Sequence, residues 1–396
     1  MKFLYLANIR FPTEKAHGLQ IAQMCEAFVQ AGADLTLLVP RRNNTPEMKG
    51  ITDPWSYYGV QRNFAVRRIM CLDLFSIGRG FERFAFPIQT LTYTLVLAVI
   101  LLFRNADVYY SRDIFTLLVV SIIKPRRKLF YEAHNISKSP IGGLLQGWCA
   151  RRCAAVFAVT GKLAEELRRP GGTQVIVAHD GFQIARFANV PDVDSARHTL
   201  NLPSDAFIVG YSGRLHTMGL SKGIDTLIAA IAGVRDLPIT LCLVGGPSEI
   251  ADSLSARWLK QGLPAFRFVF AGHVAPSLVP LYIAAFDVCA MPSPNNAFFA
   301  YYASPLKLFE YMAVGKPILS SDHPAIAEVI HNDESALLVP PEGVSALSSA
   351  LRRLYEDATL RERLGKAAKA AANEYSWQAR AERILKTIRE SVSRER

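Results

Sequence analysis

The sequence predicts an α/β protein built from two doubly wound domains, each with a parallel sheet covered by helices. Short runs rich in Val, Ile, Leu and Phe alternate with helical segments of about 10–15 residues, the pattern of parallel sheets buried on both faces. A chain of 396 residues is too long for one ordinary core. A polar segment near residues 185–205 separates two such series, which indicates two domains in tandem.

Each predicted strand is a short apolar run that ends in a turn or a polar residue. In the first series the strands are 2–8, 34–40, 107–112, 128–134, 154–160 and 174–180, with a helix over 18–32. In the second series they are 206–213, 239–246, 266–272, 286–292, 317–322 and 336–340, with a helix over 223–234. Ligands of such sheets bind at the carboxyl ends of the strands, so we expect a site in the cleft between the domains.

Positive charge is concentrated in the first half of the chain. Residues 1–185 hold 23 Lys and Arg against 13 Asp and Glu, a net charge of +10, whereas residues 186–396 hold 22 against 21, a net charge of +1. This asymmetry indicates an anionic partner for the first half, either nucleic acid or a membrane. Because the sequence shows no recognition-helix, zinc or aromatic-stacking module, we expect an anionic membrane surface and no nucleic acid.

The segment LTYTLVLAVILLF, residues 91–103, is apolar nearly all round. Extended back to Ile88, directly after Pro87, it reaches about 16 residues, short of the ~20 that a spanning helix needs. Two interpretations remain open, a buried crossover helix or a helix that dips into the membrane interface. Its position directly before the strand 107–112 favours the crossover.

The cysteines and the N-terminus indicate the compartment. Six cysteines are scattered without a disulfide framework, which is typical of a reduced, cytoplasmic protein. The N-terminal run MKFLYLANIR is too short for a signal peptide and predicts a first buried strand. We therefore expect a cytoplasmic protein, peripheral on the inner face of the membrane.

The segment SGRLHTMGLSKGIDTLIAA, residues 212–230, follows a predicted strand at its carboxyl end. Gly213 lets the backbone approach a ligand closely, and Lys222 precedes a helix whose first amides suit an anion. Arg214 and Lys222 would form a two-cation clamp for a diphosphate. The alternative is a surface loop with two solvated cations.

The segment SPLKLFEYMAVGKPI, residues 304–318, predicts a helix with an anion at its start. Ser304 and Pro305 stand before the helix, where a side chain and the amides near Leu306 suit phosphate. Lys307 runs against the usual preference for acids in the first turn, as a bound phosphate would explain. Glu310 lies on the same face and suits a pair of hydroxyls such as a ribose diol; the alternative is a solvated Lys–Glu salt bridge.

In their order and spacing these motifs resemble the retaining glycosyltransferases of family 4, which have the GT-B fold. The resemblance is strongest over about 205–342, in GRL…SKGIDTLIAA, LVGG, VFAGHV, SPLKLFEYMAVGKPIL and HNDESALLVPP. It implies an acceptor-binding N-terminal domain, residues 1–185 plus about 376–396, because the last helix of the family crosses back. Residues 186–375 would then bind a nucleoside-diphosphate sugar.

The resemblance assigns roles to individual residues of both domains. Arg214 and Lys222 would neutralise the diphosphate, Glu310 would hold the ribose, and backbone atoms around His273 and Val274 would meet the base. In the first domain Gly18, expected in the loop after the first strand, would let the backbone approach the phosphates. His134 matches the active-site histidine near the transferred sugar. His17 is open between lining the cleft and capping the next helix.

The same resemblance implies front-face substitution with retention and no cofactor. Cations and helix ends would carry the diphosphate charge, so no metal is required. The D-x-D at Asp192–Asp194 lies in a polar linker, which favours a solvated loop over a metal site. The acceptor would be a glycan or lipid-linked precursor of the cell envelope.

One position departs from the family pattern. The family has a second carboxylate eight residues before the ribose-binding one, and here that position is Tyr302. Recognition of the donor hydroxyls must therefore differ. Two alternatives stay open beside the transferase, a GT-B-type nucleotide-sugar epimerase and a non-catalytic nucleotide-sugar-binding protein.

Overall fold

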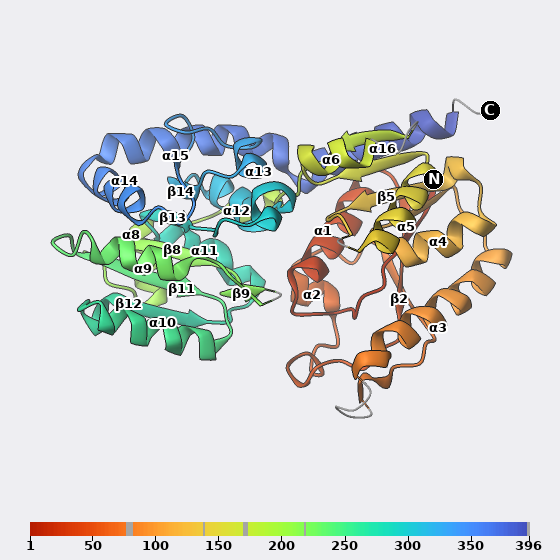
Figure 1. Ribbon diagram of the computed structural model, residues 1–396, viewed down its shortest axis with the longest axis horizontal. Coiled ribbons are helices and arrows are strands. Elements are labelled where there is room, and N and C mark those ends of the chain that lie inside the picture. Colours follow the sequence, from red (N-terminus) through yellow and green to blue (C-terminus); the bar gives the residue numbers. More distant parts are fainter. Residues whose placement is uncertain (77–81, 138, 169–172, 218, 394–396) are drawn as a thin grey trace. The chain divides into compact units, whose positions relative to one another are not determined.

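The computed structural model describes residues 1–76, 82–137, 139–168, 173–217 and 219–393 (Figure 1). The chain divides into two compact units, Met1–Asp180 with Trp377–Arg396 and Gly181–Ser376. The first crossing lies five residues before the expected boundary at 185, and the chain returns one residue after the expected 375.

The first unit is built on a seven-stranded sheet in which every pair of neighbouring strands is parallel. The order is β3-β2-β1-β4-β5-β6-β7. The strands are β1 (Lys2–Leu6), β2 (Asp34–Pro40), β3 (Ala65–Ile69), β4 (Val108–Ser111), β5 (Leu129–Ala133), β6 (Ala155–Ala158) and β7 (Gln174–Val177).

Helices cover both faces of this sheet. The α-helices are α1 (Ala16–Gln30), α2 (Pro54–Tyr58), α3 (Glu82–Phe103), α4 (Ile114–Ile123), α5 (Pro140–Arg151), α6 (Gly161–Arg168) and α16 (Trp377–Ser393), and short 3₁₀ turns are η1 (Pro46–Met48), η2 (Leu74–Ser76) and η4 (Arg126–Lys128). The connections through α3, α4 and α5 advance in one direction across the sheet, so right-handed crossovers place these three helices on one face. The connection through α1 runs the other way, and α16 packs against α1.

The observed length and burial of helix α3 differ from what was expected, whereas its role as a crossover helix is confirmed. It has 22 residues and contains Pro87, so it is longer than the apolar run of about 16 residues that was expected to begin after this proline. It connects β3 to β4, which confirms a crossover helix. It is not fully buried, because only 33% of its most apolar window is covered. By length and composition it is the one described helix that could cross a membrane.

The second unit is built on a six-stranded parallel sheet in the order β12-β11-β8-β13-β14-β15, with a separate antiparallel hairpin of β9 and β10. The strands are β8 (Phe207–Ser212), β9 (His216–Thr217), β10 (Leu220–Ser221), β11 (Ile239–Val244), β12 (Phe268–Gly272), β13 (Val288–Met291), β14 (Ile318–Ser321) and β15 (Leu337–Val339).

The helices of the second unit bury this sheet from both sides. They are α7 (Ile184–Phe187), α8 (Val193–Leu200), α9 (Ile224–Ala232), α10 (Ser248–Lys260), α11 (Val279–Ala285), α12 (Leu306–Val314), α13 (Pro324–Ala327), α14 (Val344–Glu356) and α15 (Ala358–Ala372), with 3₁₀ turns η5 (Ala265–Arg267), η6 (Pro276–Leu278) and η8 (Asn373–Tyr375) and a π-helical turn η7 (Phe298–Tyr302). Successive strand residues point to opposite faces, so Ile208 and Val209 enter two different apolar clusters. This explains why the predicted strands are continuous apolar runs rather than alternating ones.

Candidate functional site

In the second unit the order in which strands are added to the sheet reverses at β8. Its neighbours are β11 on one side and β13 on the other. Ligands of doubly wound sheets bind beyond the carboxyl ends of the strands at such a point. The loops that follow these strands touch through their backbones. A Cβ on Gly223, which has a φ of +78°, would lie 1.6 Å from the carbonyl oxygen of Pro292, so only glycine fits between β13 and the start of α9.

Lys307 lies in the first turn of α12 and reaches the end of β8. Its Nζ lies 3.3 Å from the centroid of the Tyr211 ring, and a Cβ on Gly213 would be 3.0 Å from this nitrogen. One turn later the Tyr311 hydroxyl accepts the N–H of Ser212 at 2.8 Å, which fixes the helix against the strand. Gly213 therefore makes room for the ammonium group of Lys307.

Burial and neighbouring positive charge change the protonation of this lysine. Burial first, and then Lys222, hold the pKa of Lys307 well below its ordinary value, although Glu310 opposes them. A charged ammonium in such a place lacks a counter-charge of sufficient strength. An anion at the start of α12 would provide one.

Lys222 and Arg214 complete a group of three cations at this strand end. The Lys222 Nζ lies 4.5 Å from the centroid of the Phe299 ring. Burial, and after it the charge of Arg214, lowers the pKa of Lys222 to about 8. The structure thus brings together Arg214, Lys222 and Lys307 from three separate segments, whereas Arg214 itself stays exposed.

Glu310 has a partner that the sequence did not indicate. Its Oε1 lies 3.6 Å from Nη1 of Arg186, with both side chains largely buried, and Arg186 also donates to the carbonyl oxygen of Pro276. Burial raises the pKa of Glu310 despite the opposing charges of Arg186 and Lys307. Glu310 is therefore not part of a solvated salt bridge with Lys307, since its ion pair is with Arg186 and both groups are desolvated.

The remaining predicted residues of the second unit lie around this point. Ser304 stands directly before Pro305, the N-cap of α12, and Leu306 is the first helical residue, so all three lie at the helix start as expected, and their contact with a phosphate stays a prediction. His273 and Val274 follow β12, beside the loop after β11, where the N–H of Gly245 donates to the carbonyl oxygen of Gly272 at 2.7 Å. Their contact with a base stays a prediction.

Two further positions concern the departure from the family pattern and the D-x-D segment. Tyr302 ends the π-helical turn η7, which also carries Phe299, the aromatic ring next to Lys222. The Asp192 carboxylate caps α8 by accepting the N–H of Ser195 at 2.8 Å. The D-x-D segment therefore has a structural role at a helix start.

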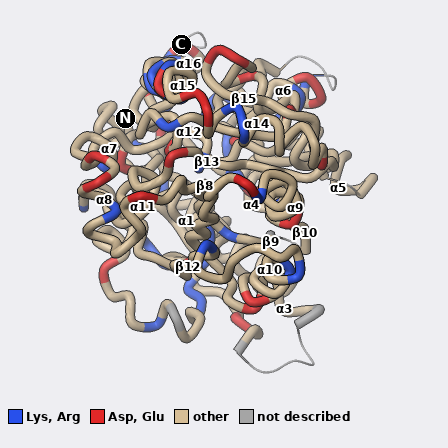
Figure 2. Tube along the Cα trace, turned by 90° about the vertical axis from the view of Figure 1, so that its left-hand side faces the viewer, with Lys and Arg blue, Asp and Glu red and all other residues tan. Residues whose placement is uncertain are grey.

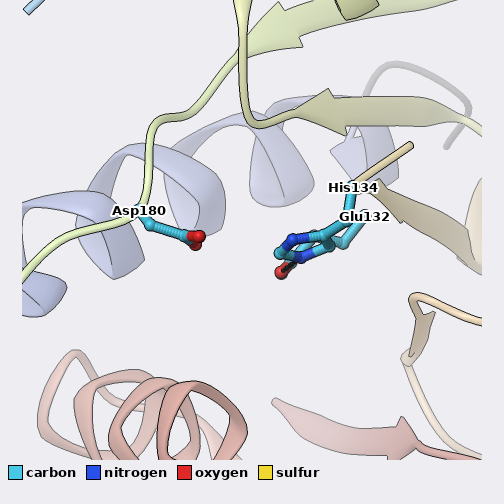
Figure 3. A group of neighbouring side chains, drawn as sticks. All are labelled: Glu132, His134 and Asp180. Atoms are coloured by element: carbon cyan, nitrogen blue, oxygen red, sulfur yellow. Dashed lines mark hydrogen bonds and ion pairs between the residues drawn. The ribbon is translucent and has the colours of Figure 1, made fainter. Parts of the chain in front are cut away.

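In the first unit His134 follows β5 and lies with Glu132 and Asp180 (Figure 3). The His134 Nε2 faces Oε1 of Glu132, which assigns the proton to Nε2. Nδ1 is then the ring nitrogen that remains for a ligand. Burial first and Arg112 second lower the pKa of His134, so the imidazole is neutral near pH 7.

Glu132 is held by a network of buried groups. Its Oε1 accepts from Gln20 Nε2 at 2.8 Å, and its Oε2 accepts from the Tyr110 hydroxyl and faces Arg380 Nη1 at 3.4 Å. Burial alone would raise the pKa of Glu132, but Arg380 and His134 outweigh it and hold the pKa well below its ordinary value. Glu132 is thus an ionised anchor for His134.

The same three side chains have the spacing of a metal site, since their ligand atoms lie within 4.8 Å of one another. However, Glu132 already bonds Gln20 and His134 through one oxygen and Tyr110 and Arg380 through the other. A cation would have to displace donors that already occupy both oxygens of Glu132. The network therefore fits an orienting role for His134 better than it fits a metal.

Two expectations at the start of the first unit need correction. Gly18 lies inside α1 rather than in the loop before it, and a Cβ there would be 2.4 Å from the Tyr58 hydroxyl and 2.5 Å from Cγ2 of Thr13. Its lack of a side chain makes room for this packing. His17 does not cap α1, whose N-cap is Lys15. Burial, then Arg112 and Lys15, lower the pKa of His17 to about 3.

This geometry agrees with what is found among known proteins. The model of the family Glycosyl transferases group 1 matches residues 206–357, the part that holds the three cations and Glu310. Residues 206–357 are a glycosyl transferases group 1 domain. This match confirms the predicted likeness to the group 1 glycosyltransferases, whereas membership of family 4 and retention of configuration stay predictions. The D-inositol 3-phosphate glycosyltransferase of Streptomyces bingchenggensis is 30% identical over 238 residues, which cover 56% of this chain and 50% of the relative.

A second relative matches a similar share of the chain. The enzyme of the same name from Corynebacterium urealyticum is 28% identical over 237 residues, 54% of this chain and 51% of its own. The chain thus spans about half the length of the curated relatives it matches.

Solved structures show the fold. Sucrose-phosphate synthase of Thermosynechococcus elongatus superposes with a TM-score of 0.77 at 20% identity, covering 100% of both chains. HepE of Anabaena, solved with UDP-glucose, gives 0.71 at 19% identity, covering 98% of this chain and 100% of HepE. WaaG, a glycosyltransferase involved in lipopolysaccharide biosynthesis, gives 0.68 at 14% identity, covering 98% and 99%. The predicted GT-B fold is confirmed.

Proposed function

We propose that this protein is a retaining glycosyltransferase that moves a sugar from a nucleoside-diphosphate sugar to an acceptor hydroxyl. The observation that carries the proposal is the group of Arg214, Lys222 and Lys307 at the switch point of the second sheet, where both lysines have lowered pKa values. The glycosyltransferase names of the relatives support the reaction, and the UDP-glucose bound by HepE supports the donor class.

The three cations would act on the leaving group. Transfer of the sugar leaves negative charge on the diphosphate, and preorganised cations stabilise charge that develops in the transition state. Binding of the diphosphate would also raise the pKa of Lys307 and Lys222, because the anion stabilises the charged ammonium groups that burial has separated from water. Glu310, held by Arg186, would accept hydrogen bonds from the ribose hydroxyls.

His134 would contribute a hydrogen bond rather than a base of its own. Because Nε2 is engaged by Glu132, the nitrogen that would face a substrate hydroxyl is Nδ1. Front-face substitution would leave deprotonation of the acceptor to the departing phosphate. No metal would be required, since three cations and the start of α12 would carry the diphosphate charge.

For the acceptor we propose a glycan or lipid-linked precursor of the cell envelope. The charge of +10 over residues 1–185 would attract an anionic membrane surface, whereas +1 over the rest would not. Figure 2 shows Lys and Arg as well as Asp and Glu along the helices of the second unit. A cytoplasmic protein, peripheral on the inner face of the membrane, would meet such an acceptor.

The test is a thermal-shift panel with UDP, GDP, ADP, TDP and CMP, each with magnesium and with EDTA. A nucleotide at a hundred times its Kd should stabilise the protein by about 2.7 kcal/mol. We expect one diphosphate to raise the melting temperature equally with and without magnesium, and Lys307→Met to abolish the shift. No shift from any nucleotide contradicts the proposal, and a shift that needs magnesium contradicts its metal-independent part.

The matching nucleotide sugar then decides the reaction. With an acceptor preparation from membranes, nuclear magnetic resonance of the product should show the anomeric configuration of the donor. Conversion of the donor to an epimer without any acceptor would replace the transferase by an epimerase. Binding without turnover, with or without acceptor, would make the protein a nucleotide-sugar-binding protein.

A further inference from the structure

Helix α3 presents a continuous row of apolar side chains to solvent. Leu91, Leu95, Val99 and Leu102 are 54–58% exposed. Their spacing of three and four residues places them on one side of the helix. The opposite side is packed, because Leu97 and Leu101 are completely buried. The outer side of a surface helix in a globular protein usually carries charged and polar residues.

The two neighbouring helices extend this row into a surface. Helix α4 packs against α3 and exposes Ile122 to 73%, and α5 packs against α4 and exposes Leu144 to 74%. All three helices cover the same face of the sheet (Figure 1). We call the exposed residues Leu91, Leu95, Val99, Leu102, Ile122 and Leu144 the apolar helix face. Contiguous apolar patches of this kind mark interaction sites.

The charges around this surface indicate what it binds. Residues 84–103 of α3 and the whole of α4 contain no charged side chain, and the one acidic residue of α3 is Glu82 at its first position, nine residues before Leu91. Arg104 and Arg127 are exposed and lie just beyond the C-terminal ends of α3 and α4. An apolar side bordered by arginines fits the interface of an anionic bilayer, where hydrophobic contact and lipid charge act together. A second copy of a unit with this excess of positive charge would be repelled instead.

The packing of α3 indicates that it lies on the bilayer rather than across it. Tyr93 is completely buried and donates its hydroxyl to the carbonyl oxygen of Leu38 in β2 at 3.2 Å. Crossing the bilayer would pull this side of the helix off the sheet and leave the strand bare. Docking by the exposed side leaves the packing of α3 against the sheet unchanged.

We propose that the apolar helix face docks the first unit onto an anionic lipid bilayer. This specifies the surface that would serve the membrane partner of the proposed function, yet it requires neither nucleotide nor turnover. The six apolar side chains enter the headgroup region, and Arg104 and Arg127 contact the acidic headgroups. The acceptor would then be a molecule that is presented at the membrane surface.

The experiment is sedimentation of the full chain with vesicles, without nucleotide. The vesicles are pure phosphatidylcholine or phosphatidylcholine with about 30% phosphatidylglycerol, at low and at raised salt. The first variant, Leu95→Glu with Ile122→Glu, changes the apolar helix face. The matched control, Leu259→Glu with Phe266→Glu, changes two apolar residues of the second unit that are 52% and 77% exposed. Arg104→Gln with Arg127→Gln tests the charged border.

We expect wild type and the control to bind the anionic vesicles, and the Leu95/Ile122 variant to bind at least about tenfold more weakly. The arginine variant should lose most of the preference for phosphatidylglycerol and its sensitivity to salt. If wild type stays unbound at low salt, or if the Leu95/Ile122 variant binds as wild type does, the proposal is overturned. A wild-type dimer in light scattering that this variant separates would assign the surface to a second copy. Because Leu95 and Ile122 are both exposed, we do not expect their substitution to lower the melting temperature. If it does, the arginine variant tests the same surface independently.

Discussion

Arg380 in the last helix and Glu132 in β5 form an ion pair in which the side chains are only 1% and 0% exposed. They are 248 residues apart in the sequence, with Nη1 and Oε2 at 3.4 Å. Arg380 also donates to the carbonyl oxygens of Ala178 and His179. The return of the chain to the first unit therefore supplies the charge that keeps Glu132 ionised beneath His134.

Replacement of Arg380 by leucine should destabilise the first unit strongly. Removing one partner of a buried pair leaves an uncompensated charge and typically costs about 3–5 kcal/mol. Thermal unfolding would measure the loss, with Arg383→Leu, at an exposed position of the same helix, as the control expected to change little. Adding Glu132→Gln to Arg380→Leu should restore part of the stability. Equal melting temperatures for Arg380→Leu and Arg383→Leu would contradict the role of the pair.

The sequence predicted the elements that depend on local pattern. Parallel strands buried on both faces are continuous apolar runs, so every strand of the two parallel sheets except β3 was visible, and the strand ends then predicted that Arg214, Lys222 and Lys307 converge. Strand β3 was missed because it is an edge strand with mostly exposed residues, two of them arginines. Helix α3 was underestimated because only its apolar part was counted and Pro87 was taken as its limit. Gly18 was misplaced because the start of α1 has no side-chain cap to mark it.

The partners that act across the chain could not be predicted from local pattern. Arg186 stands in a segment without periodicity, so nothing related it to Glu310 before the fold was known. Phe299 and Arg380 were missed because their partners, Lys222 and Glu132, lie far away along the chain. Glu132 gave one usable signal, a carboxylate inside the apolar run KLFYEAH, because a buried charge requires a partner.

His17 should make stability depend on pH. Its pKa of about 3 in the folded protein lies below the ordinary value near 6.5, so the unfolded chain binds the proton first. Its contribution is therefore complete above about pH 6.5 and is lost as the pH falls, by up to about 1.4 kcal/mol per pH unit. Melting temperatures at about pH 7.5 and 4.5 should show that His17→Gln loses less than wild type on acidification. The control is His198→Gln, at an exposed position of α8, and equal losses for His17→Gln and wild type would refute the expectation.

Lys222 should make nucleotide binding depend on pH. Its pKa of about 8 means that free protein loses this charge between pH 7 and 9, whereas the diphosphate binds the charged form. Affinity should therefore fall by about tenfold over this range as the pH rises. Lys222→Arg stays charged throughout and should remove most of the dependence. Titration calorimetry with the diphosphate from the thermal-shift panel measures both proteins, and parallel pH profiles would exclude Lys222 from the anion site.

Arg186 and Glu310 should act on nucleotide binding as a unit. Glu310→Ala should weaken binding by about 1.5–3 kcal/mol, the scale of a hydrogen bond to a charged group. Arg186→Leu should weaken it as well, because the carboxylate loses the partner that orients it. The double variant should then cost less than the sum of the two single losses, since coupled residues are not additive. Additive losses in the same calorimetric measurement would show that Arg186 does not act through Glu310.

Gly223→Ala should disrupt the switch point of the second sheet for a steric reason. The new Cβ would meet the carbonyl oxygen of Pro292 at 1.6 Å, and the φ of +78° adds backbone strain. Gly262 offers a matched control, because its φ of +74° imposes the same strain while nothing lies within 4 Å of its Cβ position. Gly262→Ala should cost only about 1 kcal/mol or somewhat more, the price of a left-handed alanine. Gly223→Ala should lower the melting temperature well beyond this and abolish the nucleotide-induced shift, because it separates the start of α9 and Lys222 from the loop after β13. If the two alanine variants melt alike and both bind nucleotide, the backbone contact at Gly223 does not organise the anion site.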